Sequence, residues 1–153
     1  MATLYVAGQY PGAGSTAVVT ALATAWKQTG QRIAVIKPAA LSLNADSAFY
    51  AKVFDSTDEA PWVLTDHEPG ALIARAAKQV NALTAEHDLV IIEGLPLFDA
   101  DGNAVEASPT LAELLGSQVL GVVPYHRGLN GADATVWHDT YASLLSVVVI
   151  NRI

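Results

Sequence analysis

The sequence predicts an α/β fold in which a mostly parallel β-sheet lies between two layers of helices. Short apolar runs, most of them β-branched, recur along the chain without alternation of polar and apolar positions, which is typical of strands buried on both faces. The runs are residues 3–7, 32–36, 89–92, 119–123 and 147–150. Segments with helical spacing separate them, and this alternation of strands and helices indicates βαβ units.

Each connecting helix is predicted from its apolar spacing and its end signals. Residues 16–29 place Val18, Leu22 and Trp26 on one side, and Gly30 is expected to end the helix. Residues 70–86 repeat the pattern. Ser108 is expected to cap a short helix that has Pro109 at its first position and ends at Gly116. Further helices are expected over residues 46–54 and 132–145, and a polar surface loop over 98–107.

Length and composition indicate one domain with a sizeable core. The chain has 153 residues, of which 52% are hydrophobic and 15% charged, so we expect a single domain over residues 1–153. The chain stops directly after an apolar strand, whereas domains more often finish in a helix or a polar tail. We therefore expect it to be the front part of a longer protein, or a domain cut at its edge.

Charge and hydropathy exclude several classes of partner. The formal net charge is −7, which disfavours a nucleic-acid binder because such proteins need a basic face. No apolar run is long enough to cross a bilayer, and the N-terminus lacks the basic start of a signal peptide. The absence of cysteine excludes disulfides and thiolate metal sites and suits a cytoplasmic protein. The four histidines show no metal-ligand spacing, so we expect ordinary surface or helix-end residues.

A glycine-rich loop follows the first strand and runs directly into the first helix. The residues expected to contact a ligand there are Gly8, Gly12, Ala13, Gly14, Ser15 and Thr16. A strand, such a loop and a helix N-terminus together direct backbone N–H groups and a partial positive charge at one point, which favours a phosphate. Thr16 is placed to hold Mg²⁺ through its hydroxyl, as in a P-loop.

The loop departs from the strict P-loop pattern at two positions. The lysine that normally precedes the threonine is replaced by Ser15, and the leading glycine is displaced from Gln9 to Gly8. Without that lysine one charge-assisted hydrogen bond to the phosphates, worth roughly 1.5–3 kcal/mol, is missing. Taken alone, the loop is also compatible with a glycine-rich turn that binds nothing.

Other residues place this loop in a family context. Lys37-Pro38 follows the second strand, Glu93-Gly94 follows the third, and Asn151 closes the last one. In this order the chain resembles the dethiobiotin synthetase family of P-loop enzymes, and equally the related N-terminal domain of some long phosphotransacetylases. The resemblance covers nearly the whole chain in its order of elements, although its specific motifs are few.

The resemblance implies a set of site residues. The loop would wrap the triphosphate of ATP, and Thr16, Asp46 and Glu93 would bind Mg²⁺. Lys37 would be the catalytic lysine beside the phosphates, and Asn151 would read the adenine edge. Ligands bind at the carboxyl ends of strands in such sheets, where these residues can converge. Each has a plainer interpretation as a surface or strand-end residue, and Asp55 and Asp58 compete with Asp46.

Three functions remain open. The first is a nucleotide-binding domain that is regulatory or weakly catalytic, because the phosphotransacetylase-type domain often lacks the loop lysine too. The second is an ATP-dependent carbon–nitrogen ligase acting on a small amine or carboxylate, with Lys37 replacing the lost charge. The third is a module that keeps the fold and binds a partner. The family resemblance and the apolar composition are compatible with a homodimer.

Overall fold

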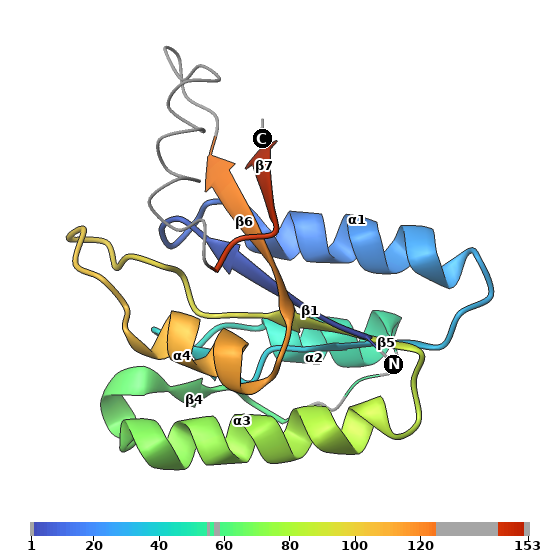
Figure 1. Ribbon diagram of the computed structural model, residues 1–153, viewed down its shortest axis with the longest axis horizontal. Coiled ribbons are helices and arrows are strands. Elements are labelled where there is room, and N and C mark those ends of the chain that lie inside the picture. The colour runs from blue at the N-terminus through green and yellow to red at the C-terminus, as the bar shows by residue number, and fades with distance from the viewer. Residues whose placement is uncertain (1, 55, 57–58, 125–143, 152–153) are drawn as a thin grey trace.

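The centre of the molecule is a five-stranded parallel sheet (Figure 1). The computed structural model describes residues 2–54, 56, 59–124 and 144–151. In spatial order the strands are β2 (Ile33–Ile36), β5 (Leu89–Glu93), β1 (Ala2–Gly8), β6 (Gln118–Pro124) and β7 (Val147–Asn151). Every neighbouring pair is parallel. The five predicted strands and the parallel sheet are therefore confirmed.

Helices cover both faces of this sheet and complete the predicted three layers. Among the described residues the helices are α1 (Ser15–Lys27), α2 (Asp46–Val53), α3 (Pro69–Thr84) and α4 (Ala107–Leu114), with a short 3-10 turn, η1, at Leu64–Asp66. Side chains of α1 and α2 pack in the apolar cluster on one face, and those of α3 and α4 in the cluster on the other. Figure 1 shows α1 and α3 on opposite sides of the strands. The expected helix over residues 132–145 falls almost wholly outside the described residues.

The alternation of side chains along β5 determines where its last residue points. Leu89 and Ile91 belong to the cluster beneath α1 and α2, whereas Val90 and Ile92 belong to the cluster beneath α3 and α4. Successive side chains of a strand point to opposite faces, so Glu93 continues the first series. The carboxylate therefore points toward α1 and α2, although it ends a strand that is buried throughout.

A second, very small sheet was not predicted from the sequence. It pairs β3 (Ala39–Ala40) with β4 (Trp62–Val63) in parallel. Two-residue strands carry no measurable alternation, and alanine has little β preference, so no signal for this pairing was present in the local sequence. The small sheet holds the segment that follows β2.

The predicted start of α4 was wrong. The helix begins at Ala107 with Glu106 as its N-cap, so Ser108 lies inside the first turn. Ser108 is fully buried, and its hydroxyl donates to the carbonyl of Leu95 at 2.7 Å while lying 3.2 Å from the hydroxyl of Tyr5. The amide of Leu95 donates to that tyrosine oxygen at 3.0 Å. Ser108 thus stabilises a buried polar cluster instead of capping the helix.

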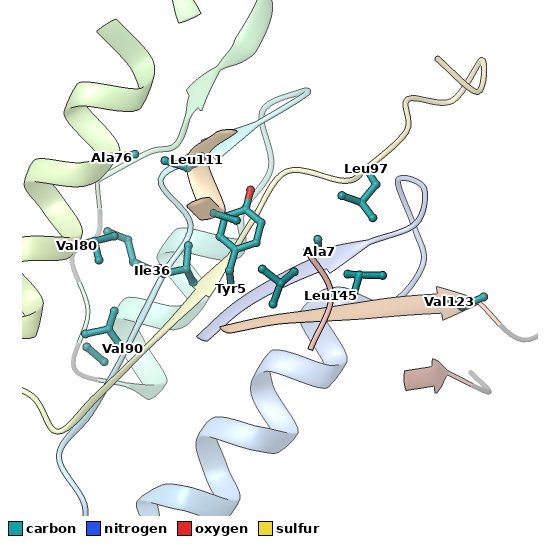
Figure 2. Packing of buried hydrophobic residues seen from close by; sticks show 14 residues of the cluster. Tyr5, Ala7, Ile36, Ala76, Val80, Val90, Leu97, Leu111, Val123 and Leu145 are labelled. Atoms are coloured by element: carbon teal, nitrogen blue, oxygen red, sulfur yellow. The ribbon is translucent and has the colours of Figure 1, made fainter. Parts of the chain in front are cut away.

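Tyr5 links this polar cluster to the apolar packing on the α3 and α4 face. Figure 2 shows its ring among other buried side chains of the cluster, including Ile36 and Leu111. Burial of the hydroxyl raises the pKa of Tyr5 to about 12, and the hydrogen bonds with Ser108 and Leu95 oppose that effect. The ring fixes the position of the chain immediately after β5.

The expected surface loop over residues 98–107 is more ordered than predicted. Phe98 and Ala104 form an antiparallel bridge, Val105 is buried, and Ala107 already belongs to α4. The part that does turn through solvent is held by Asp99, whose carboxylate accepts from the backbone amides of Asp101 and Asn103. None of the helices in the described parts of the chain has both the length and the apolarity to cross a bilayer.

Candidate functional site

Most of the predicted site residues converge at the carboxyl ends of three neighbouring strands, β2, β5 and β1, whereas Asn151 ends β7 at the edge of the sheet. A cavity of about 330 Å³ opens there. The loop after β1 forms one wall, and Lys37, Asp46 and Glu93 form another. The convergence expected from the sequence is therefore present in the structure, even though the three segments are far apart along the chain.

The loop after β1 presents backbone groups to this cavity. Its two turning points are Gly12 and Gly14, with φ of 83° and 90°, values that side-chain-bearing residues rarely adopt. Gly14 is the N-cap of α1, and no side chain caps that helix. The first-turn N–H groups of a helix have no partner within it, so an anion is a suitable ligand for this end of α1.

The start of the loop is fixed to the segments beside it. The carbonyl of Gly8 accepts from the amide of Leu97 at 2.9 Å, and Gln9 pairs through its amide with Val122 at 2.8 Å. A Cβ added at Gly8 would lie 3.0 Å from the carbonyl oxygen of Tyr10. Glycine at position 8 thus permits the chain to turn closely here. This explains why the leading glycine of the loop is at position 8 and not at position 9.

Glu93 is the centre of the polar contacts in the site. Its Oε1 accepts hydrogen bonds from the hydroxyls of Ser15 at 3.2 Å and Thr16 at 2.9 Å. The side chain is only 3% exposed. A buried carboxylate needs such donors because its desolvation is costly. Glu93 is therefore a buried, hydrogen-bonded residue of the cavity wall, and its interpretation as a solvated strand end is excluded.

Lys37 lies between two carboxylates. Its Nζ is 2.5 Å from Oδ2 of Asp46 and 3.0 Å from Oε1 of Glu93. The side chain of Lys37 is 10% exposed and that of Asp46 is 27% exposed. Asp46 is the first residue of α2, as expected, and its backbone amide donates to the side-chain oxygen of Asn44 at 3.1 Å. The competing acids at positions 55 and 58 lie outside the described residues.

Sequence reasoning missed Tyr50 as a member of this cluster. Its hydroxyl donates to Oε2 of Glu93, the carboxylate oxygen that Thr16 and Lys37 leave free. Burial, followed by the charge of Glu93, raises the pKa of Tyr50 above its ordinary value of 10.0. One signal was available: Asp46 and Tyr50 are four residues apart, which places them on the same face of a helix.

The small β3–β4 sheet positions the backbone beside Lys37. The carbonyl of Pro38 accepts from the amide of Trp62 at 3.1 Å and from the guanidinium of Arg75 at 3.4 Å. Arg75 also lies 4.8 Å from the centre of the Trp62 ring. These contacts hold the turn after β2. The backbone of Lys37 is therefore fixed in a position from which its amine reaches the two carboxylates.

Asn151 contacts the glycine-rich loop that follows β1. Its side-chain amide donates to the carbonyl of Ala13 at 3.2 Å and approaches that of Gly14 at 3.5 Å. Asn151 is absent from the described lining of the cavity, although Gly14 belongs to it. In this structure the side chain therefore connects the end of β7 to the start of α1.

Gly94, which follows the central carboxylate, has a packing role. A Cβ at this position would lie 2.1 Å from Cζ of Tyr5. The chain after β5 can pass the tyrosine ring only because glycine has no side chain. Gly94 and Pro96 then line the cavity next to Glu93.

The donor set of the site fits Mg²⁺ bound together with phosphates. Thr16, Asp46 and Glu93 supply a hydroxyl and two carboxylates, and Mg²⁺ in proteins uses one or two carboxylates completed by water and substrate phosphates. Within the described residues no group of three or more His, Cys, Asp and Glu forms a metal cage. His67 stacks on Trp62 at 3.9 Å, and Nδ1 of His87 lies 2.8 Å from the carbonyl of Leu83, so these histidines make structural contacts.

A family model described as an AAA domain matches residues 2–148. The chain belongs to this family. No protein of curated function matches it. The fold of this AAA domain is the α/β fold of P-loop NTPases, as its solved structural neighbours also show.

These neighbours share the fold at low sequence identity. The chimerical protein CapA2B2 has a TM-score of 0.67 and 19% identity, over 99% of this chain and 76% of that one. The signal recognition particle 54 kDa protein of Aeropyrum pernix K1, solved in complex with GDP, has a TM-score of 0.68 and 13% identity, over 99% of this chain and 35% of that one. The kinase domain of the Escherichia coli tyrosine kinase ETK has a TM-score of 0.64 and 19% identity, over 99% and 69%.

Proposed function

We propose that this AAA domain binds ATP with Mg²⁺ in the cavity at the carboxyl edge of the sheet, and that its role is regulatory or weakly catalytic. The observation that carries the proposal is the convergence of Lys37, Asp46 and Glu93 on the phosphate loop around one cavity. A glycine turn that had kept only its shape would not need a buried lysine between two carboxylates, since burying such charges is costly.

The roles of the individual residues follow from their positions. Backbone N–H groups at the start of α1 bind the phosphates, while Thr16, Glu93 and Asp46 hold the metal. Bound Mg²⁺ would supply positive charge at the phosphate oxygens. Asn151, which contacts the carbonyl of Ala13, is proposed to read the adenine edge from that place.

The reduced catalytic power is proposed from the absence of a lysine at position 15. Ser15 directs its hydroxyl to Glu93 at 3.2 Å and brings no positive charge. Phosphoryl transfer depends on fixed charges that stabilise the transition state. Without a lysine at position 15, we expect nucleotide binding to exceed turnover.

Isothermal titration of the full chain with ATP in the presence of excess Mg²⁺ tests the proposal. We expect a saturable heat at micromolar to millimolar nucleotide, together with slow or absent ADP formation. Gly14→Val is the negative control, because a β-branched residue cannot adopt the left-handed φ of 90° at this position. If the wild type gives no heat at millimolar nucleotide, the proposal fails.

A ligase of the dethiobiotin synthetase type is the second candidate, and the place of Lys37 favours it. The amine of Lys37 lines the cavity beside the phosphate loop, where it would stabilise charge on a substrate activated by ATP. ADP release provoked by a small amine or carboxylate, and abolished in Lys37→Ala, would support this activity. The absence of ADP release with every such substrate would leave the binding function alone.

A further inference from the structure

Lys37 forms ion pairs with both acidic residues of the cavity wall. Its amine is in contact with Asp46 on α2 and with Glu93 at the end of β5, at 2.5 and 3.0 Å. These two acids are the ones proposed to hold the metal. Lys37 is therefore placed as a positively charged group between the carboxylates that a divalent cation would need.

The charge of the cavity wall is unsuited to a free polyphosphate. Among the described lining residues, Lys37 is the cation and Asp46 and Glu93 are the anions, which leaves a net charge of −1. Position 15, where a loop lysine would add positive charge, is a serine whose hydroxyl is already donated to Glu93. The backbone N–H groups of α1 would therefore have to bind phosphate against a negative wall.

We propose that Lys37 is a resident counter-cation for Asp46 and Glu93, and that nucleotide enters this site only as its complex with a divalent metal ion. The inference rests on the proposed function and adds an obligatory coupling between the two ligands. Asp46 and Glu93 would hold the divalent ion in place of Lys37, and the added charge would change the net charge of the lining from −1 to +1. The released amine of Lys37 then pairs with the phosphates.

Neither ligand binds well alone, for separate reasons. A metal ion without nucleotide must displace Lys37 from two carboxylates and leave its charge in the cavity without a partner. A nucleotide without metal is repelled, because its phosphates and the lining of the cavity are both negatively charged. When metal and nucleotide are both present, the metal would neutralise the two carboxylates, and the amine of Lys37 would pair with the phosphates. Such coupling is reciprocal, so each ligand raises the affinity for the other by the same factor.

Titration of the full chain with ATP in EDTA and in excess Mg²⁺, at matched ionic strength, measures this coupling. We expect ATP to bind at least about 100-fold more weakly in EDTA, near the upper end of typical coupling factors. Mg²⁺ alone should give no saturable binding at millimolar concentration. Equal affinity for ATP in both conditions would overturn the inference and leave nucleotide binding intact. The absence of binding in both would overturn the proposed function and the inference with it.

Two variants separate this proposal from a merely structural salt bridge. Lys37→Ala removes the amine from between the carboxylates, so Mn²⁺ should bind to this variant without nucleotide. The electron paramagnetic resonance signal of free Mn²⁺ should therefore fall when the variant is added and stay unchanged when the wild type is added. Ser15→Lys adds a positive charge at the loop, so the ratio between the two ATP affinities should shrink by at least about tenfold. Circular dichroism confirms folding of each variant. A ratio unchanged in a folded Ser15→Lys would contradict the proposal, and this test does not depend on the stability of Lys37→Ala.

Discussion

The hydroxyl of Tyr50 donates a hydrogen bond to Oε2 of Glu93, while Oε1 of the same carboxylate accepts from Thr16 and Lys37. Tyr50 thus holds the carboxylate oxygen to which Thr16 and Lys37 are not bonded. Since Asp46 lies one helical turn earlier on α2, this helix supplies both an acid of the site and the donor that orients the other acid. The position of α2 is therefore coupled to the geometry of the site.

Tyr50→Phe should destabilise the domain by about 1–3 kcal/mol, because it removes one donor from a buried carboxylate. Urea unfolding followed by circular dichroism measures this loss. Tyr10→Phe is the matched control: Tyr10 is 41% exposed, so its unfolding midpoint should stay close to that of the wild type. A Tyr50→Phe midpoint equal to that of the control would contradict a structural role for this hydrogen bond.

The buried hydroxyls of Tyr5 and Tyr50 should make the domain sensitive to alkali. Burial raises the pKa of Tyr5 to about 12 and that of Tyr50 above its ordinary value. A group whose folded-state pKa is raised stabilises the fold fully below its unfolded pKa of about 10, and this contribution is lost as the pH rises through the folded-state value. The free energy of unfolding should therefore fall as the pH rises above 10, and less steeply in Tyr5→Phe and Tyr50→Phe. Slopes identical to that of the wild type would rule out these two residues as the cause.

Gly94→Ala should destabilise the domain by about 1–3 kcal/mol through overpacking. The new Cβ would meet the ring of Tyr5 at 2.1 Å, and a ring buried on all sides has little room to move. Denaturant unfolding of Tyr5→Ala, Gly94→Ala and the double variant forms a cycle. We expect the glycine substitution to cost little once the ring is absent. Additive costs would show that Gly94 is required for another reason.

The ion pairs of Lys37 and that of Arg32 should differ in their importance for stability. Lys37→Ala leaves Asp46 and Glu93 facing each other without a cation, and breaking such a buried arrangement costs about 3–5 kcal/mol. Arg32 and Asp88 pair at 2.9 Å but are largely exposed, so Arg32→Ala should barely change the unfolding midpoint. Thermal unfolding with and without Mn²⁺ adds a second comparison: the metal should restore stability to Lys37→Ala and leave Arg32→Ala unchanged.

Asn151→Ala should reduce the preference for ATP over GTP, if the side chain reads the base as proposed. The amide also supports the loop through the carbonyl of Ala13 at 3.2 Å. Loss of that support alone would weaken the binding of ATP and of GTP by the same factor. The ratio of the two dissociation constants therefore distinguishes base recognition from loop support. Titrations of wild type and variant with each Mg²⁺–nucleotide complex provide this ratio, and an unchanged ratio would assign Asn151 to loop support.

Much of the fold could be predicted because buried parallel strands have a distinctive composition. The run at 89–92 is apolar at every position, and β5 occupies it with one further residue, Glu93. The convergence of Lys37 and Glu93 also followed from sequence, since the residues after parallel strands share one edge of the sheet. These predictions depend on local pattern and on general topology, which one sequence contains.

The details that could not be predicted depend on contacts between distant segments. Ser108 has the composition of a helix cap, and only its neighbours Tyr5 and Leu95 show why it is buried. The spacing of Tyr50 and Asp46 places them on one face of a helix, but only the placement of α2 against β5 shows that Tyr50 contacts Glu93. The contact of Lys37 with both acids could likewise be seen only when α2 and β5 had been placed relative to each other.

The order of strands in the sheet has a kinetic consequence. The groups around the cavity come from the ends of β1, β2 and β5, which are separated by long stretches of chain and paired in parallel. Such pairings form late and slowly because long loops must close first. A ligand that needs all three strands can bind only after they have assembled. It should therefore prolong the lifetime of the folded domain while leaving the rate at which the chain refolds unaltered.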